Sequence, residues 1–177
     1  GTINVHKGFL QSVDEFELIQ GVAEGIRLLN QSPYLVIVAT NQPVIARGEC
    51  TFEELDKIHK KMETDLGKKG AFLNDIFFCP HHPHKGYMGE VPELKIDCDC
   101  RKPKIGMLQR AADKYNIDLT QSWYVGDTTM DIQTGINAGM RTVLVKTGEA
   151  GKDGKYDVVP IAEKENLLEA VQFILGD

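Results

Sequence analysis

The sequence predicts an α/β protein of one domain, built on a parallel sheet with helices on both of its faces. Short β-branched apolar runs, typical of strands buried on both faces, alternate with stretches whose apolar residues recur at helical spacing. The chain has 177 residues, enough for one domain with a substantial core. Alternating β and α units of this length form parallel sheets, and ligands bind beyond the carboxyl ends of such strands.

The expected elements follow from these patterns along the chain. Thr51 and Glu54 have the spacing of a capping box, which predicts the start of the second helix. Strands are expected at residues 34–39, 75–79, 123–126, 141–145 and 156–159, and helices around residues 22–29, 55–62, 106–115, 130–138 and 164–174.

Composition and charge narrow the class of protein. Hydrophobic residues make up 42% of the chain and charged residues 26%, which is typical of a globular protein. A net charge of -6 argues against a nucleic-acid binder, which would carry a basic face, but leaves room for a phosphorylated small molecule. No apolar run is long enough to cross a membrane, and no signal-peptide pattern opens the chain. We therefore expect a cytoplasmic monomer without membrane or nucleic-acid partners.

One segment interrupts the alternation of strands and helices. Residues 79–103 are rich in Pro, Gly, His and Cys, lack periodicity, and are too long for an ordinary connection. Cys79, Cys98 and Cys100 lie there together with His81, and nothing indicates a secreted disulfide protein. Three thiolates and one imidazole suit a tetrahedral structural zinc site. The alternative is a loop of free thiols with incidental histidines.

Polar and basic residues follow the first strand and precede a later helix. Thr40, Asn41 and Gln42 come at the end of the first apolar run, where a hydroxyl and an amide can bind a phosphate oxygen. An ordinary polar turn would look the same. Arg101 and Lys102 lead into the helix at residues 106–115, where such cations can bind a phosphoryl group or can simply be solvated.

Two carboxylates mark another strand-to-helix junction. Asp127 follows Gly126 at the end of the strand at 123–126, and Asp131 lies one helical turn later. Paired carboxylates at this edge suit Mg²⁺, a hard cation that prefers oxygen ligands. Helix capping by Asp127, with Asp131 solvated in the first turn, explains the spacing equally well.

Taken in order, these signals resemble the motifs of phosphatases of the haloacid dehalogenase (HAD) superfamily. Gly1-Thr2-Ile3 is similar to the tail of the D-x-D-G-T motif that opens the family; Thr40, Lys102 and Asp127 with Asp131 stand at the three later motifs. The resemblance covers nearly the whole chain and implies a Rossmann-like HAD fold. It also implies that Mg²⁺ is the catalytic cofactor.

A closer resemblance points to one branch of the family. A-T-N-Q, A-R-G, C-P-H-H-P and C-D-C-R-K-P resemble the branch of heptose bisphosphate phosphatases and histidinol phosphatases. The zinc ligands of that branch correspond to Cys79, His81, Cys98 and Cys100. The length of the loop between His81 and Cys98 favours the sugar phosphate over histidinol phosphate. Pro43-Val44, where relatives have Ser-Gly, and Thr128, where lysine is common, depart from the pattern and concern substrate binding.

The resemblance also assigns roles to residues. In this family the first Asp of D-x-D forms an aspartyl-phosphate and the second acts as acid and base. Both, with the central first strand, would lie upstream of Gly1, so we expect a working protein about ten residues longer. The implied roles are phosphoryl stabilisation by Thr40 and Lys102, Mg²⁺ binding by Asp127 supported by Asp131, substrate recognition by Arg101, and substrate binding by His6, Lys7, Gly8, Phe9, Asn41 and Gln42.

The resulting expectation is a Mg²⁺-dependent phosphatase that removes the C7 phosphate from D-glycero-D-manno-heptose 1,7-bisphosphate. Such an enzyme would supply heptose for lipopolysaccharide. Histidinol-phosphate phosphatase is the alternative enzyme. A zinc-stabilised binding module without catalysis is an alternative of another class, because both predicted aspartates lie outside the chain.

Overall fold

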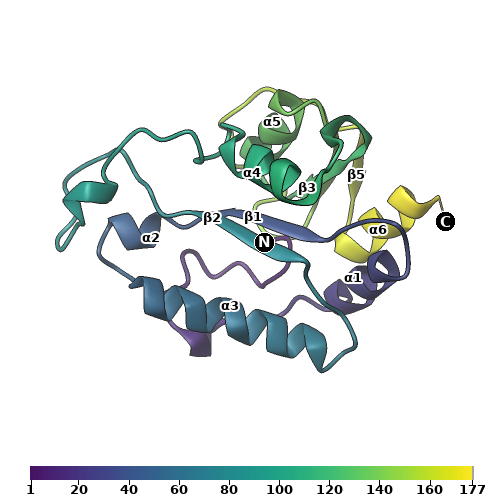
Figure 1. The fold of residues 1–177 in the computed structure, drawn as a ribbon, viewed down its shortest axis with the longest axis horizontal. Helices are drawn as coiled ribbons and strands as arrows, with labels where there is room; N and C mark the ends of the chain where they lie inside the picture. The colour runs from purple at the N-terminus through teal and green to yellow at the C-terminus, as the bar shows by residue number, and fades with distance from the viewer. Residues whose placement is uncertain (177) are drawn as a thin grey trace.

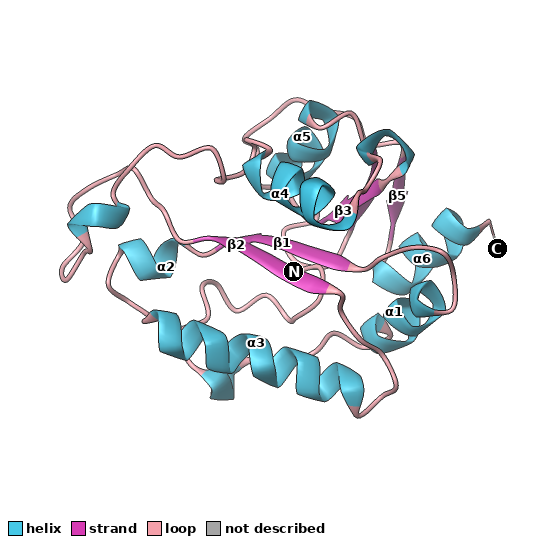
Figure 2. Cartoon of the chain, viewed as in Figure 1, coloured by secondary structure: helices cyan, strands magenta, loops and turns pink. Residues whose placement is uncertain are grey.

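The computed structural model describes residues 1–176 and contains two groups of parallel strands flanked by helices (Figure 1; Figure 2). β1 (Ile37–Asn41) pairs with β2 (Asp75–Cys79). β3 (Trp123–Gly126) pairs with β4 (Arg141–Val145), which also pairs with β5 (Ala162–Lys164). All three pairings are parallel, which confirms the prediction from the alternating pattern.

Helices cover both faces of these strands. In Figure 1, α3 runs along one side of β1 and β2, while α4 and α5 lie on the other side. No described helix is both long enough and apolar enough to cross a membrane. The helices are α1 (Val22–Asn30), α2 (Pro43–Ala46), α3 (Phe52–Gly67), α4 (Gly106–Tyr115), α5 (Thr129–Asn137) and α6 (Leu167–Leu175), with short 3₁₀ turns at Val13–Glu15, Pro92–Leu94 and Leu119–Gln121.

The largest core cluster joins the apolar faces of α1, α3 and α6. Ile26, Leu66 and Val171 are buried there, and Ile26 lies in the helix that was expected around residues 22–29. The predicted capping box at the start of α3 is confirmed, because the Thr51 hydroxyl accepts from Glu54 N at 3.1 Å and Glu54 Oε2 accepts from Thr51 N at 2.7 Å. Such a cap is worth about 1 kcal/mol of helix stability.

Two expected strands differ from the structure. β1 begins at Ile37 and ends at Asn41, so Thr40 and Asn41 belong to the strand that was expected at 34–39. The strand expected at 156–159 is wrong: those residues form none, Val159 is 84% exposed, and Pro160 cannot donate to a ladder. The strand next to β4 at this edge of the sheet is β5 instead. The last helix therefore begins after β5 and spans residues 167–175, whereas it was expected around 164–174.

β1 and β3 are not paired with each other. One edge of each strand lines a cavity of about 760 Å³, together with apolar residues such as Ile3 and Leu108. The cavity reaches the carboxyl ends of both strands, where Thr40 and Asp127 also line it. In an α/β sheet this is the edge at which ligands bind.

Candidate active site

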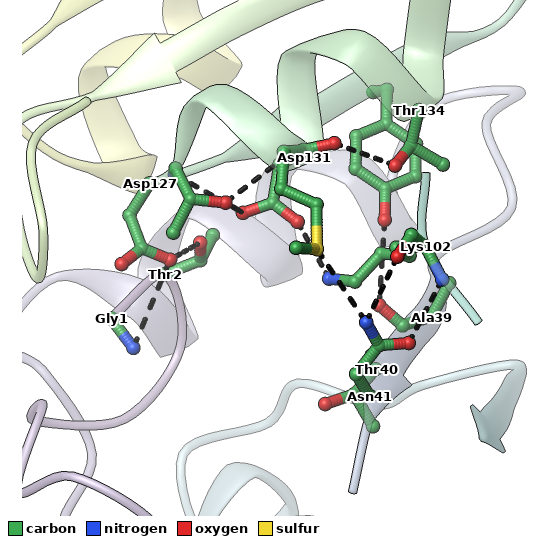
Figure 3. A network of polar contacts seen from close by, with 12 residues as sticks. Gly1, Thr2, Ala39, Thr40, Asn41, Lys102, Asp127, Asp131 and Thr134 are labelled. Atoms are coloured by element: carbon green, nitrogen blue, oxygen red, sulfur yellow. Dashed lines mark hydrogen bonds and ion pairs between the residues drawn. The ribbon is translucent and has the colours of Figure 1, made fainter. Parts of the chain in front are cut away.

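The residues assigned to phosphate and magnesium binding converge at the carboxyl ends of β1 and β3 (Figure 3). Thr40 is the penultimate residue of β1, Lys102 precedes α4, and Asp127 follows β3. Asp131 lies in the first turn of α5. All four line the same cavity, although 91 residues of sequence separate the first from the last.

Asp127 is held by hydrogen bonds from two other segments. Thr2 Oγ1 donates to its Oδ1 at 3.0 Å, and the backbone N–H of Glu149 donates to its Oδ2 at 3.0 Å. Gly148 has φ +63°, and a Cβ there would lie 2.2 Å from Asp127 Oδ2, so only glycine permits this approach. Each carboxylate oxygen keeps an acceptor site for a hard cation such as Mg²⁺.

Asp131 and Lys102 form a buried ion pair. Lys102 Nζ lies 2.6 Å from Asp131 Oδ1, and their side chains are 13% and 7% exposed. The other oxygen of Asp131 accepts from Thr128 N at 3.1 Å and Thr128 Oγ1 at 2.7 Å, which closes a capping box on α5. Burial disfavours charge on both groups and is the largest single effect on each. The attraction and hydrogen bond between the two groups, together with those of their neighbours, outweigh it, so the pKa of Lys102 is raised and that of Asp131 is lowered. The pair is therefore ionised at neutral pH.

Two amides after the first strand position the phosphate-binding groups. Asn41 Oδ1 accepts from Lys102 N at 3.0 Å, and Asn41 Nδ2 lies 3.4 Å from Lys102 O. Gln42 Nε2 donates to Thr40 Oγ1 at 3.2 Å, which leaves the threonine proton free for a phosphoryl oxygen. Asn41 thus fixes the lysine backbone, a task that its predicted role in substrate binding did not include.

The amino-terminal loop and Arg101 border the same cavity. His6, Gly8 and Phe9 line it, whereas Lys7 points elsewhere and pairs with Glu17 at 2.9 Å. Arg101 lines the cavity too, and its Nη1 donates to the carbonyl of His81 at 3.1 Å. The substrate roles of these residues remain predictions.

The predicted zinc ligands form one cluster. The ligand atoms of Cys79, His81, Cys98 and Cys100 all lie within 4.8 Å of one another. The three sulfurs are 3.1, 3.3 and 3.5 Å apart, near the spacing of about 3.8 Å that Zn–S bonds of about 2.3 Å give in a tetrahedron. Burial raises the pKa of the Cys79 and Cys100 thiols, a cost that a bound divalent cation offsets. The donor set therefore fits structural zinc.

Sequence reasoning missed two residues of the site. Tyr124 reads as part of an apolar strand, yet its hydroxyl reaches Ala39 O in β1 at 3.4 Å, and burial raises its pKa to about 12. Glu149 follows β4, whose carboxyl end reaches the same edge of the fold. Its backbone binds Asp127 and its Oε1 pairs with His6 Nε2 at 3.0 Å. The strand-end rule could have indicated Glu149, whereas no local signal marks Tyr124.

Comparison with known proteins identifies relatives of the chain. A family model described as HAD-hydrolase-like matches residues 99–166. The D-glycero-beta-D-manno-heptose-1,7-bisphosphate 7-phosphatase of Escherichia coli strain K12 is 41% identical over 150 residues, covering 84% of this chain and 76% of its own. The enzyme of the same name from Salmonella typhi is 41% identical over 179 residues, covering 100% of this chain and 88% of its own.

A solved structure gives the same result for the fold. The D,D-heptose 1,7-bisphosphate phosphatase of B. bronchiseptica, complexed with magnesium and phosphate, has a TM-score of 0.85 and 33% identity, covering 99% of this chain and 94% of that one. The fold and site define a phosphoric monoester hydrolase of the HAD type. Within that class, the chain belongs to the family of the heptose-1,7-bisphosphate 7-phosphatases.

Proposed function

We propose that the protein is a Mg²⁺-dependent phosphatase that removes the C7 phosphate of D-glycero-D-manno-heptose 1,7-bisphosphate in the cytoplasm, as a step in lipopolysaccharide synthesis. The observation that supports this most is the convergence of Thr40, Lys102 and Asp127 at one end of the cavity. A hydroxyl donor, a buried cation and a metal-binding carboxylate around one point suit the charge of a phosphoryl group. The choice of substrate rests on the names of the relatives.

Magnesium binding is assigned to Asp127. Its carboxylate is fixed by Thr2 and Glu149, so it is oriented before a metal arrives. Asp131 supports the site differently, because its Oδ1 is taken by Lys102 and its Oδ2 by Thr128. When bound, Mg²⁺ would supply positive charge that polarises the phosphoryl oxygens and orients them for attack.

The nucleophile and the acid–base group are proposed to come from residues that precede Gly1. The Gly1 nitrogen is 4.0 Å from Asp127 Oδ1, so residues just before it would enter the site. At about 3.3 Å per residue, aspartates one and three positions before Gly1 would lie within about 10 Å of it. The strand that carries them would run along the cavity, between the unpaired edges of β1 and β3.

The proposed reaction has two steps, formation of an aspartyl-phosphate and its hydrolysis. The first Asp attacks phosphorus and the bond to the C7 oxygen breaks, while the second Asp protonates that oxygen. The second Asp then takes a proton from water, which attacks the aspartyl-phosphate and releases inorganic phosphate. Thr40 and Lys102 hold the phosphoryl oxygens through both steps, and the zinc cluster keeps the loop beside Arg101 ordered.

Phosphate release from the heptose bisphosphate tests the proposal. The full chain with its upstream residues should release one phosphate in Mg²⁺ and none after chelation. Lys102→Met should lower kcat by about 100-fold or more, whereas Lys60→Met, whose side chain is 70% exposed on α3, should change nothing. Normal turnover in Lys102→Met would refute the role of Lys102. A chain that releases no phosphate from any ester would support the zinc-stabilised binding module instead.

A further inference from the structure

The loop that follows β4, residues 147–156, holds Asp127 at two points. The N–H of Glu149 donates to Asp127 Oδ2 at 3.0 Å, and the N–H of Gly151 donates to the Asp127 carbonyl at 2.8 Å. One turn of this loop therefore sets both the side chain and the backbone of the proposed magnesium ligand. Because a ligand's outer partners orient it before the metal binds, a displacement of this turn would turn the carboxylate away.

The turn has a backbone conformation that its own sequence does not favour. Ala150 has φ +51°, in the left-handed region that residues with a side chain rarely adopt, and Gly151 follows at φ +73°. Such a conformation persists only where surrounding contacts hold it. Asp153 holds the far end of the loop, because its Oδ1 accepts from Thr129 N at 2.6 Å at the start of α5. The near end, which carries Glu149, requires a contact of its own.

His6 supplies that contact. Its Nε2 lies 3.0 Å from Glu149 Oε1, and both residues line the cavity. The segment that carries His6 also contains Thr2, whose hydroxyl donates to the other oxygen of Asp127 at 3.0 Å (Figure 3). The contacts form a closed ring, since residues 1–6 bind one oxygen of Asp127, the loop after β4 binds the other, and the pair of His6 and Glu149 joins the two segments.

The importance of this pair lies in the segments that it joins. The side chains of His6 and Glu149 are 42% and 40% exposed, and a contact of that kind adds little to global stability. Backbone hydrogen bonds of 2.9 and 3.0 Å, however, tie residues 3–5 to residues 17–19. His6 therefore follows an anchored segment and can fix the position of the loop.

We propose that His6 is a positioning residue, which acts through Glu149 to orient Asp127 for the cation, in place of the substrate contact that the family resemblance implies. The inference deepens the magnesium site of the proposed function and rests on it. Loss of the pair leaves the N–H of Glu149 in the chain but frees the turn, so Asp127 is oriented less well before the cation binds.

Calorimetry of Mg²⁺ binding, without substrate and on the full chain with its upstream residues, tests this role. The Kd for Mg²⁺ should rise about three- to fivefold in His6→Ala and by a similar factor in Glu149→Ala, because each change removes the same contact. The double variant should bind no more weakly than either single one. Glu149→Gln removes the charge but keeps an acceptor for His6, and it should stay within about twofold of wild type. Glu165→Gln, in the exposed pair with Lys146, is the matched control and should change nothing.

Amide hydrogen exchange gives a readout that needs neither metal nor activity. The N–H groups of Glu149 and Gly151, which both donate to Asp127, should exchange about three- to fivefold faster in His6→Ala than in wild type. The N–H of Thr129, which is held by Asp153 at the other end of the loop, should exchange at an unchanged rate.

The possible results separate the inference from the proposed function. An unchanged Kd and unchanged exchange in His6→Ala, or single losses that multiply in the double variant, would overturn the positioning role. A raised KM for the bisphosphate with normal Mg²⁺ affinity would also overturn it and assign His6 to the substrate. A wild-type chain that releases no phosphate would refute the proposed function, whereas exchange of the two amides would still decide the role of His6.

Discussion

Replacing Asp131 with Asn tests the buried ion pair that connects α5 to the phosphate-binding lysine. Lys102 Nζ and Asp131 Oδ1 are 2.6 Å apart, which corresponds to an attraction of about 6 kcal/mol at an effective dielectric constant of about 20. Desolvation of both groups offsets much of that attraction. Removing one partner, however, leaves the other charge buried, and we expect a loss of about 3–5 kcal/mol of unfolding free energy.

Urea unfolding at pH 7 measures this loss of unfolding free energy. Asp56→Asn, on the exposed surface of α3, is the matched control, and there we expect a loss below about 1 kcal/mol. The double variant Asp131→Asn with Lys102→Met should recover most of the stability, because no charge is then left unpaired. A loss below about 1 kcal/mol in Asp131→Asn, or a double variant as unstable as the sum of the two single changes, would contradict the reasoning.

The pH dependence of the same loss has a definite sign. The folded pKa of Asp131 is below its ordinary value of about 3.9, so its contribution is present above about pH 4 and disappears as pH falls through the folded value. The stability difference between wild type and Asp131→Asn should therefore stay constant from pH 5 to pH 7 and shrink in more acidic solution. A difference that grew on acidification would exclude the ion pair as its cause.

Three further changes probe the separate parts of the site. Thr40→Val should lower kcat by about 10-fold in steady-state kinetics, because one hydrogen-bond donor to the phosphoryl group is lost, and it should have little effect on unfolding. An unchanged kcat would exclude Thr40 from the mechanism. Asp127→Asn should raise the Mg²⁺ concentration needed for half-maximal activity by at least about 10-fold in a metal titration. An unchanged titration would show that Asp127 is not a magnesium ligand. Cys98→Ser should reduce the zinc content, measured by metal analysis, from about one equivalent per chain to much less than one. It should also lower Tm, because the tetrahedral ligand set loses a thiolate. Full zinc content would refute the assignment of Cys98 as a ligand.

The sequence indicated most of the site because strand ends in a parallel sheet meet at one edge. Thr40 and Asp127 each followed an apolar run, so their convergence followed from the fold class alone. The zinc ligands could be predicted for a different reason. Three cysteines and histidines gather in one loop, which suits zinc, and the family resemblance assigns the ligands to Cys79, His81, Cys98 and Cys100.

What the sequence could not indicate depends on contacts between distant segments. Nothing local to Arg47 predicts that Phe9 and Tyr87 enclose it, because the rings come from two loops 78 residues apart. Asn41 looked like a substrate ligand, whereas its amide is used by the Lys102 backbone. The strand expected at 156–159 failed because β-branched residues also occur in exposed connections, and only pairing with β4 selects the strand.

The proposed choice of substrate is tested most directly by comparing two values of kcat/KM, one for D-glycero-D-manno-heptose 1,7-bisphosphate and one for histidinol phosphate. Both are measured in Mg²⁺ on the full chain with its upstream residues, and their ratio decides between the two substrates. We expect a ratio of at least about 100, because the proposed substrate recognition by Arg101 favours a leaving group that carries a second phosphate over one that carries an ammonium. A ratio near or below one would contradict it.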